Sequence, residues 1–204
     1  MSARRTTLLL LGLALYGLSL SLLVRADLGL APGDVFHQGV AEVTGLSLGA
    51  VIVATSFVVL VLWIPLRERP GIGTIANAVL VGVGVDLFSA VLPDVDGTVL
   101  RWLLLPAGVV LNGVATGLYI GAGMGSGPRD GLMTGIARRG HPIRAVRTSL
   151  ELAVLIAGIA LGGSFGVGTI AYALGIGPLA HIFLPWCTRF ADGGGTPAIA
   201  ATPA

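Results

Sequence analysis

The chain has 204 residues, of which 54% are hydrophobic and only 11% are charged, and its mean hydropathy is +0.93. A soluble domain carries about 25% charged residues, so this composition excludes a soluble globular protein and indicates a helical membrane protein. The net charge is +2, but the arginines lie between apolar runs instead of forming one patch, which argues against a nucleic-acid partner.

Six apolar runs are long enough to cross a bilayer, which requires about 20 residues of helix. The first follows Arg4 and Arg5 and resembles a signal peptide, but it lacks a small-x-small cleavage site, so we expect it to remain as the first span. The fifth is short, and we expect it to extend over Arg147 or Gly163. The predicted spans are residues 7–24, 48–66, 72–92, 99–121, 148–162 and 168–186.

Two further apolar segments, residues 32–43 and 128–139, contain only about twelve residues each, too few to cross the bilayer at about 1.5 Å per residue. We predict that each is a re-entrant half-helix, because irregular backbone at membrane depth is tolerated only where protein or a water-filled cavity surrounds it. The predicted fold class is therefore all-α transmembrane, with about six spanning helices and two half-helices. The alternative is eight short spans in two parallel four-helix repeats.

The placement of the arginines favours six spans, because cytoplasmic loops carry the basic excess. With the N-terminus inside, six spans place ten arginines inside and only Arg25 and Arg101 outside, whereas eight spans weaken the split to eight against four. We therefore predict a multi-pass protein of the bacterial plasma (inner) membrane with both termini in the cytoplasm. Residues 191–204, rich in Gly, Ala, Pro and Thr, are predicted to form a disordered tail.

The chain also contains an internal repeat. A shift of 96 residues superposes Gly17 on Gly113, and with one residue removed the Gly-Thr-Ile-Ala run at 73–76 falls on that at 168–171. We predict two membrane repeats, residues 1–95 and 96–190, that form one membrane domain. Three spans per repeat force the second copy to be inverted, and inverted repeats often place a binding site near the midplane. Arg5 superposes on Arg101, as the parallel arrangement would allow, so that arrangement remains open.

The most specific local signal is a paired Gly-x-x-Pro-x-Asp motif at the start of each half-helix. Proline suits the first turn of a helix, glycine allows a sharp turn into it, and aspartate is favoured at the positive helix end. The two aspartates serve either as structural caps or as groups that face one cavity and bind a cation, a proton or a polar solute. The motif residues are Gly29, Pro32 and Asp34 in the first copy and Gly125, Pro128 and Asp130 in the second.

Polar residues beside the motif extend the candidate site. Asp34, His37 and Gln38 share one face of the first half-helix, and Thr134 lies on the matching face of the second. His37 is either a proton relay or a hydrogen-bonded structural histidine.

Other polar residues fall within the predicted spans, where charge is expensive. Asp86 and His181 are matched positions of the two repeats, and they either line the two mouths of a pathway or snorkel to the interface. We expect Asn112 to form hydrogen bonds between helices and Glu151 to pair with Arg147.

The repeated Gly-x-x-Pro-x-Asp motif, followed in each copy by a span that begins Gly-Thr-Ile-Ala, resembles the bacterial YczE/YyaS/YitT-like multi-pass membrane proteins. The resemblance extends over residues 1–190 and implies a plasma-membrane protein of about this size. It carries over no substrate, because this group is largely uncharacterised.

These features predict a secondary transporter or facilitator of a small solute, and the alternative is a non-transporting membrane scaffold or regulator. No Ser/His pairing, nucleotide loop or metal motif is present, so we expect neither an enzyme nor a cofactor. The expected partners are membrane lipids, an unknown solute or ion and, in a homo-oligomer, further copies of the chain.

Overall fold

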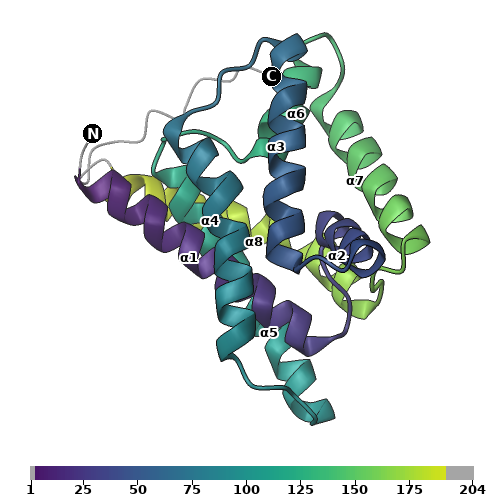
Figure 1. The fold of residues 1–204 in the computed structure, drawn as a ribbon. Helices are drawn as coiled ribbons and strands as arrows, with labels where there is room; N and C mark the ends of the chain where they lie inside the picture. The colour runs from purple at the N-terminus through teal and green to yellow at the C-terminus, as the bar shows by residue number, and fades with distance from the viewer. Residues whose placement is uncertain (1–2, 192–204) are drawn as a thin grey trace.

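The computed structural model describes residues 3–191, and all of its regular secondary structure over this range is helical (Figure 1). This confirms the all-α prediction. The predicted tail lies outside the described residues, apart from Ala191. The helices are α1 (Ala3–Ala26), α2 (Pro32–Thr44), α3 (Leu48–Leu66), α4 (Ile72–Val91), α5 (Thr98–Gly121), α6 (Pro128–Ala137), α7 (Ile143–Ala160) and α8 (Val167–Ala191).

Five of these helices, α1, α3, α4, α5 and α8, are long and apolar enough to cross a membrane. The remaining predicted span, the fifth in chain order, is α7, which has 18 residues and includes Arg144, Arg147 and Glu151 near its start. It extends over Arg147, as expected. Both α1 and α8 continue beyond the predicted apolar limits, because a helix can run on into the interfacial region once its apolar stretch ends.

The two short helices, α2 and α6, lie where the half-helices are predicted. α2 has 13 residues and ends at Gly45, whose φ of 71° stops the helix. α6 has 10 residues, two fewer than predicted, and ends at Ala137. At about 1.5 Å per residue these helices are about 20 and 15 Å long, against a hydrocarbon core of about 30 Å. In Figure 1, α2 is seen nearly end-on while α3 runs along the page, so α2 lies across α3.

Contacting residues give the relative directions of the long helices. The residue numbers rise together where α1 packs on α4 and where α5 packs on α8, so each of these pairs is parallel. They run oppositely where α1 packs on α5 and where α3 packs on α4, so these pairs are antiparallel. The contacts are Gly17–Gly84 and Arg25–Ser89 for α1 on α4, Gly113–Leu179 and Gly121–Cys187 for α5 on α8, Gly12–Tyr119 and Leu23–Gly108 for α1 on α5, and Val53–Gly82 and Ser47–Asp86 for α3 on α4.

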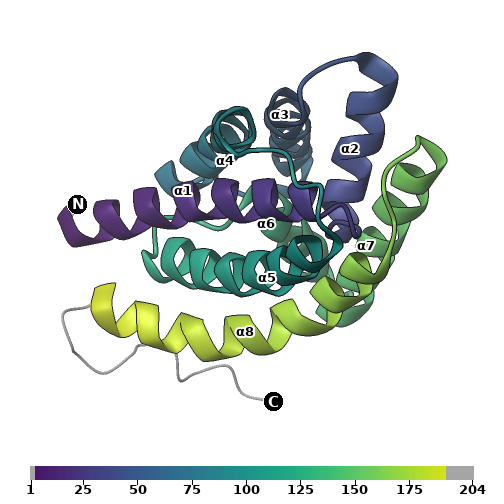
Figure 2. The ribbon, with the colours of Figure 1, turned by 90° about the horizontal axis from the view of Figure 1, so that it is seen from below.

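Buried glycines allow these helices to approach closely, as is usual in membrane proteins. α1 and α5 lie side by side in Figure 2, with α8 along the other side of α5. At their centre the fully buried Asn112 donates to Ser19 Oγ at 2.8 Å and accepts from the Tyr172 hydroxyl at 2.8 Å. The prediction that Asn112 joins helices is confirmed, and the chain of bonds ties α1, α5 and α8 together.

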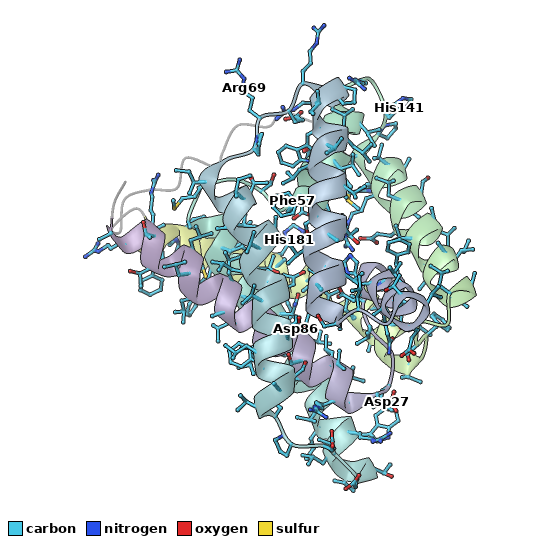
Figure 3. The ribbon with its side chains drawn as sticks, viewed as in Figure 1. Asp27, Phe57, Arg69, Asp86, His141 and His181 are labelled. Atoms are coloured by element: carbon cyan, nitrogen blue, oxygen red, sulfur yellow. The ribbon has the colours of Figure 1, made fainter. Side chains whose placement is uncertain are left out.

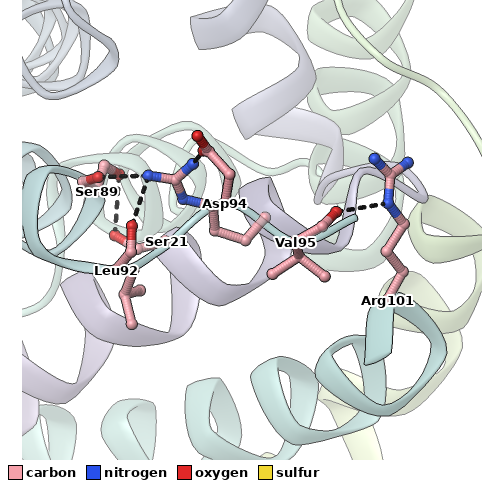
Figure 4. Close-up of polar contacts among 7 residues, drawn as sticks. Ser21, Ser89, Leu92, Asp94, Val95 and Arg101 are labelled. Atoms are coloured by element: carbon pink, nitrogen blue, oxygen red, sulfur yellow. Dashed lines mark hydrogen bonds and ion pairs between the residues drawn. The ribbon is translucent and has the colours of Figure 1, made fainter. Parts of the chain in front are cut away.

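The two ends of the bundle differ in the charges that they carry. Figure 3 shows Arg69 and His141 at one end and Asp27 at the opposite end. Near Asp27, Arg25 pairs with Asp94 and donates to the carbonyls of residues 89 and 92 (Figure 4). Arg101 donates to the carbonyl of residue 95 and to Asp27 at 3.2 Å. These bonds fasten the connection between α4 and α5 to the end of α1.

Candidate functional site

The two half-helices are held in place by matched backbone contacts. Gly29 and Gly125, the first residues of the two motifs, have φ of 107° and 127°, a region that side chains other than glycine rarely adopt. The residue before each glycine accepts a bond from the first turn of a long helix: the Leu28 carbonyl from Gly168 N at 2.6 Å, and the Met124 carbonyl from Gly73 N at 2.8 Å. The Gly-Thr-Ile-Ala run at 168–171 therefore docks the start of α2, and the run at 73–76 docks the start of α6.

The N-terminal ends of α2 and α6 face one cavity of about 190 Å³. Side chains from α1, α3, α4, α5, α7 and α8 complete its wall. The polar residues that line it are Tyr16, Asp34, His37, Thr55, Ser56, Asn77, Tyr119, Arg129, Asp130 and Tyr172.

Asp34 lies in this cavity and is 9% exposed. Its Oδ1 lies 3.2 Å from Nδ1 of His37, one turn along α2. The N-cap residue of α2 is Ala31, and no side chain caps the helix. Asp34 therefore does not act as the hydrogen-bonding cap considered from the sequence, and its carboxylate is left for His37 and the cavity.

Asp130 occupies the corresponding place on α6. Its Oδ2 accepts a hydrogen bond of 2.9 Å from the Tyr119 hydroxyl of α5, and α6 likewise begins without a side-chain cap. The indole of the buried Trp63 donates to the carbonyl of Pro128 at 3.0 Å and lies against Gly131, which fixes the first turn of α6 on α3. The structure thus brings the two predicted aspartates and His37 to one site.

Arg129 also lines this cavity, although in the sequence it stands out only as one of the arginines on the predicted cytoplasmic side. It follows Pro128 on α6, and its guanidinium reaches across to Gly33 on α2, where a Cβ would contact its NH1 unless the arginine side chain shifted. Its NH2 donates to Glu151 on α7 at 3.3 Å. Glu151 also accepts from Arg147 at 3.1 Å, and this is the pair predicted from the sequence. One signal was present in the sequence: a shift of 96 residues superposes Arg129 on Gly33 within the motif.

Gln38 and Thr134 do not line the cavity. Gln38 Oε1 accepts a bond of 2.9 Å from the backbone N of Ser164, and so holds α2 against the segment between α7 and α8. The Thr134 hydroxyl donates to the carbonyl of Gly131 within its own helix at 3.0 Å.

Asp86 and His181 also lie away from the cavity. Asp86 accepts bonds from Ser47 Oγ at 2.6 Å and from Gly49 N at 2.8 Å, so it satisfies groups at the start of α3. His181 is exposed on α8. Within residues 3–191, no three His, Cys, Asp or Glu side chains gather as a metal site.

Comparison with known proteins identifies the family. Residues 3–185 match the model of a family of unknown function, DUF6198. An uncharacterised protein of Haemophilus influenzae is 36% identical over 179 residues, 87% of this chain and 82% of its own length. Two Bacillus subtilis relatives are the uncharacterised membrane protein YczE and the uncharacterised protein YyaS.

YczE is 36% identical over 172 residues, covering 83% of this chain and 80% of its own length. YyaS is 27% identical over 186 residues, covering 88% and 92%. No solved structure matches. The resemblance to YczE and YyaS is confirmed, and the chain belongs to the DUF6198 family of membrane proteins.

Proposed function

We propose that this protein is a secondary transporter or facilitator of a small solute, which binds in the cavity between the N-terminal ends of α2 and α6. The observation that carries the proposal is the convergence of Asp34 and Asp130, from motifs 96 residues apart, on one cavity. Ionisable groups within a membrane domain are expensive and usually functional. Neither aspartate caps its own helix, so helix capping does not account for them.

The helix directions support six crossings with α2 and α6 re-entrant. If α2 crossed the membrane as well as α1, α3 and α4, then α1 and α4 would point in opposite directions. Their contacts are instead parallel, as three crossings in one repeat require. The antiparallel contacts of α1 with α5, its counterpart in the second repeat, support two copies of opposite orientation at residues 1–95 and 96–190. The parallel eight-span alternative requires the reverse in both cases.

We place the protein in the plasma membrane with both termini in the cytoplasm. Arg69 and the arginine-rich segment around His141 lie at one end of the bundle, and Asp27 lies at the other (Figure 3). Cytoplasmic loops attract the basic residues, so the Arg69 end is the cytoplasmic one. Lipids are the expected neighbours of the apolar outer faces, and a nucleic-acid partner is not part of the proposal.

The matched docking contacts suggest how access would alternate. Each half-helix is fastened to the opposite repeat, through Leu28 to α8 and through Met124 to α4. A rocking motion of one repeat against the other would therefore carry the two half-helices apart at one face and together at the other, around a fixed site. This mechanism needs no covalent chemistry, so we propose a transport protein and not an enzyme.

Cysteine accessibility tests the proposal without knowledge of the solute. In a Cys187→Ala background, Ser56→Cys places a thiol on the cavity wall, and Val58→Cys places one on the 61% exposed outer face of the same helix. A transporter predicts that a charged, membrane-impermeant thiol reagent modifies Ser56→Cys from either side of the membrane and leaves Val58→Cys unmodified.

The alternative function, a membrane scaffold or regulator, predicts a different result. Its cavity would not open alternately, so Ser56→Cys would react from one side only or from neither. Either result would contradict the transport proposal.

A further inference from the structure

The charged side chains that line the cavity do not balance. Asp34 and Asp130 are acidic and Arg129 is basic, which leaves one negative charge while His37 is neutral. The neighbouring Glu151 and Arg147 pair with each other. They add one acidic and one basic side chain, so the excess of one negative charge is unchanged. An unbalanced charge inside a membrane domain is costly, because it is not fully solvated by bulk water there.

Among the residues that the structure describes, neither cavity aspartate forms an ion pair with a permanently charged group. Over residues 3–191, the recorded partner of Asp130 is the neutral Tyr119 hydroxyl, and that of Asp34 is His37, which is charged only when protonated. Arg129 lies near both aspartates but pairs with Glu151 instead. The two carboxylates are therefore open to a positive charge from a bound solute.

Arg129 already supplies one cation to the cavity. Its guanidinium lies beside Gly33, the position that corresponds to Arg129 in the first predicted repeat, and glycine adds no side chain of its own there. Two carboxylates with one resident guanidinium leave capacity for one further positive charge.

The remaining wall suits an organic cation. The rings of Tyr16 and Tyr119 pack edge to face with centroids 6.1 Å apart, and both line the cavity together with Tyr172. Aromatic faces attract cations within about 6 Å. The cavity volume of about 190 Å³ is smaller than the roughly 300–1,000 Å³ of pockets that bind drug-sized ligands, which favours a small ligand.

We infer that the solute is a small, singly charged organic cation, whose positive group binds between Asp34 and Asp130 while Arg129 acts as a resident cation that excludes a second charge. The inference rests on the proposed function, because it names the substrate class of the same cavity. It also makes Arg129 the residue that determines how much charge the ligand carries.

Ligand binding to the purified protein in detergent tests this inference. The probes are ethylammonium, doubly protonated 1,2-diaminoethane and acetate. Two readouts run in parallel: the thermal stabilisation by each probe, and the fluorescence of Trp63 in a Trp102→Phe, Trp186→Phe background. Trp63 reports on the site because it holds the first turn of α6.

The wild type should respond to ethylammonium at a lower concentration than to the diamine, and acetate should give no response. Asp130→Asn should weaken ethylammonium binding by about tenfold to hundredfold, the scale of one charged hydrogen bond. Asp27→Asn removes a carboxylate at the end of the bundle, outside the cavity lining, and should leave binding unchanged. Arg129→Gly copies the matched residue Gly33 and should reverse the preference in favour of the diamine.

A stronger response to acetate than to ethylammonium would overturn the inference, as would no response to ethylammonium in either readout. An unchanged preference in Arg129→Gly would also overturn it, and this variant does not depend on the folding of Asp130→Asn. Each of these results leaves the cysteine accessibility of Ser56 untouched, so failure of the substrate class is distinguishable from failure of the transport proposal.

Discussion

Replacement of Gly125 by alanine tests whether the turn into α6 is built as described. Gly125 has a φ of 127°, and an alanine Cβ would lie 2.6 Å from Thr74 Oγ1 and 3.2 Å from Thr74 N. The backbone strain costs about 1–3 kcal/mol. Loss of the adjacent bond between the Met124 carbonyl and Gly73 N adds about 0.5–1.5 kcal/mol.

Together these losses amount to about 1.5–4.5 kcal/mol, which lowers the Tm of a chain of this size by about 3–18 °C. The assay is thermal unfolding of the purified protein in detergent, followed as the loss of the monodisperse peak. Gly123→Ala is the matched control, because Gly123 also has a positive φ, 65°, but has no neighbour within 4 Å of the added Cβ. It should cost only about 1–2 kcal/mol. If Gly125→Ala unfolds at or above the temperature of the control, the docking contact is not what holds α6.

Two other substitutions test the packing and the end of the bundle. Asn112→Leu leaves the hydroxyls of Ser19 and Tyr172 without their interhelical partner and should cost about 1–3 kcal/mol in the same thermal assay, so a wild-type Tm would contradict that role. Arg25→Gln should lower the Tm more than Arg101→Gln does. Arg25 donates to two backbone carbonyls in addition to its ion pair, whereas Arg101 donates to one in addition to its own. Equal or reversed losses of Tm would refute this account of the α4–α5 connection.

The sequence predicts the positions of the helices well, including those of the two short ones, because apolar length, proline and glycine act locally. Pro32 and Pro128 begin their helices at the predicted residues, and Gly45 ends α2. That Asp34 and Asp130 line one cavity was also expected from the sequence, since the predicted repeat would carry equivalent residues to equivalent places. An inverted repeat can bring such places together near the midplane.

The contacts of individual polar side chains could not be predicted in this way. Asp86 is a charged residue within an apolar run. A residue that lines a solute pathway and a residue that bonds to the end of a neighbouring helix both show this pattern. Only the packing of α3 on α4 brings it to Gly49 N. The role of Arg129 could not be predicted because its sequence context resembles that of an arginine in a loop. The packing of the helices turns its side chain towards Gly33 and Glu151.

The sidedness of Gly45 and Gly140 most directly tests the claim that α2 and α6 turn back within the membrane. Gly45 directly follows α2, and Gly140 lies three residues after the end of α6. Both have positive φ, which strains a cysteine slightly, but neither has a neighbour within 4 Å of an added Cβ, so no side chain collides with it. In a Cys187→Ala background, an impermeant maleimide should label Gly45→Cys from outside intact cells and Gly140→Cys only after the cytoplasmic face is exposed. Labelling of both residues from the same side would mean that the short helices cross the bilayer, and it would contradict the account.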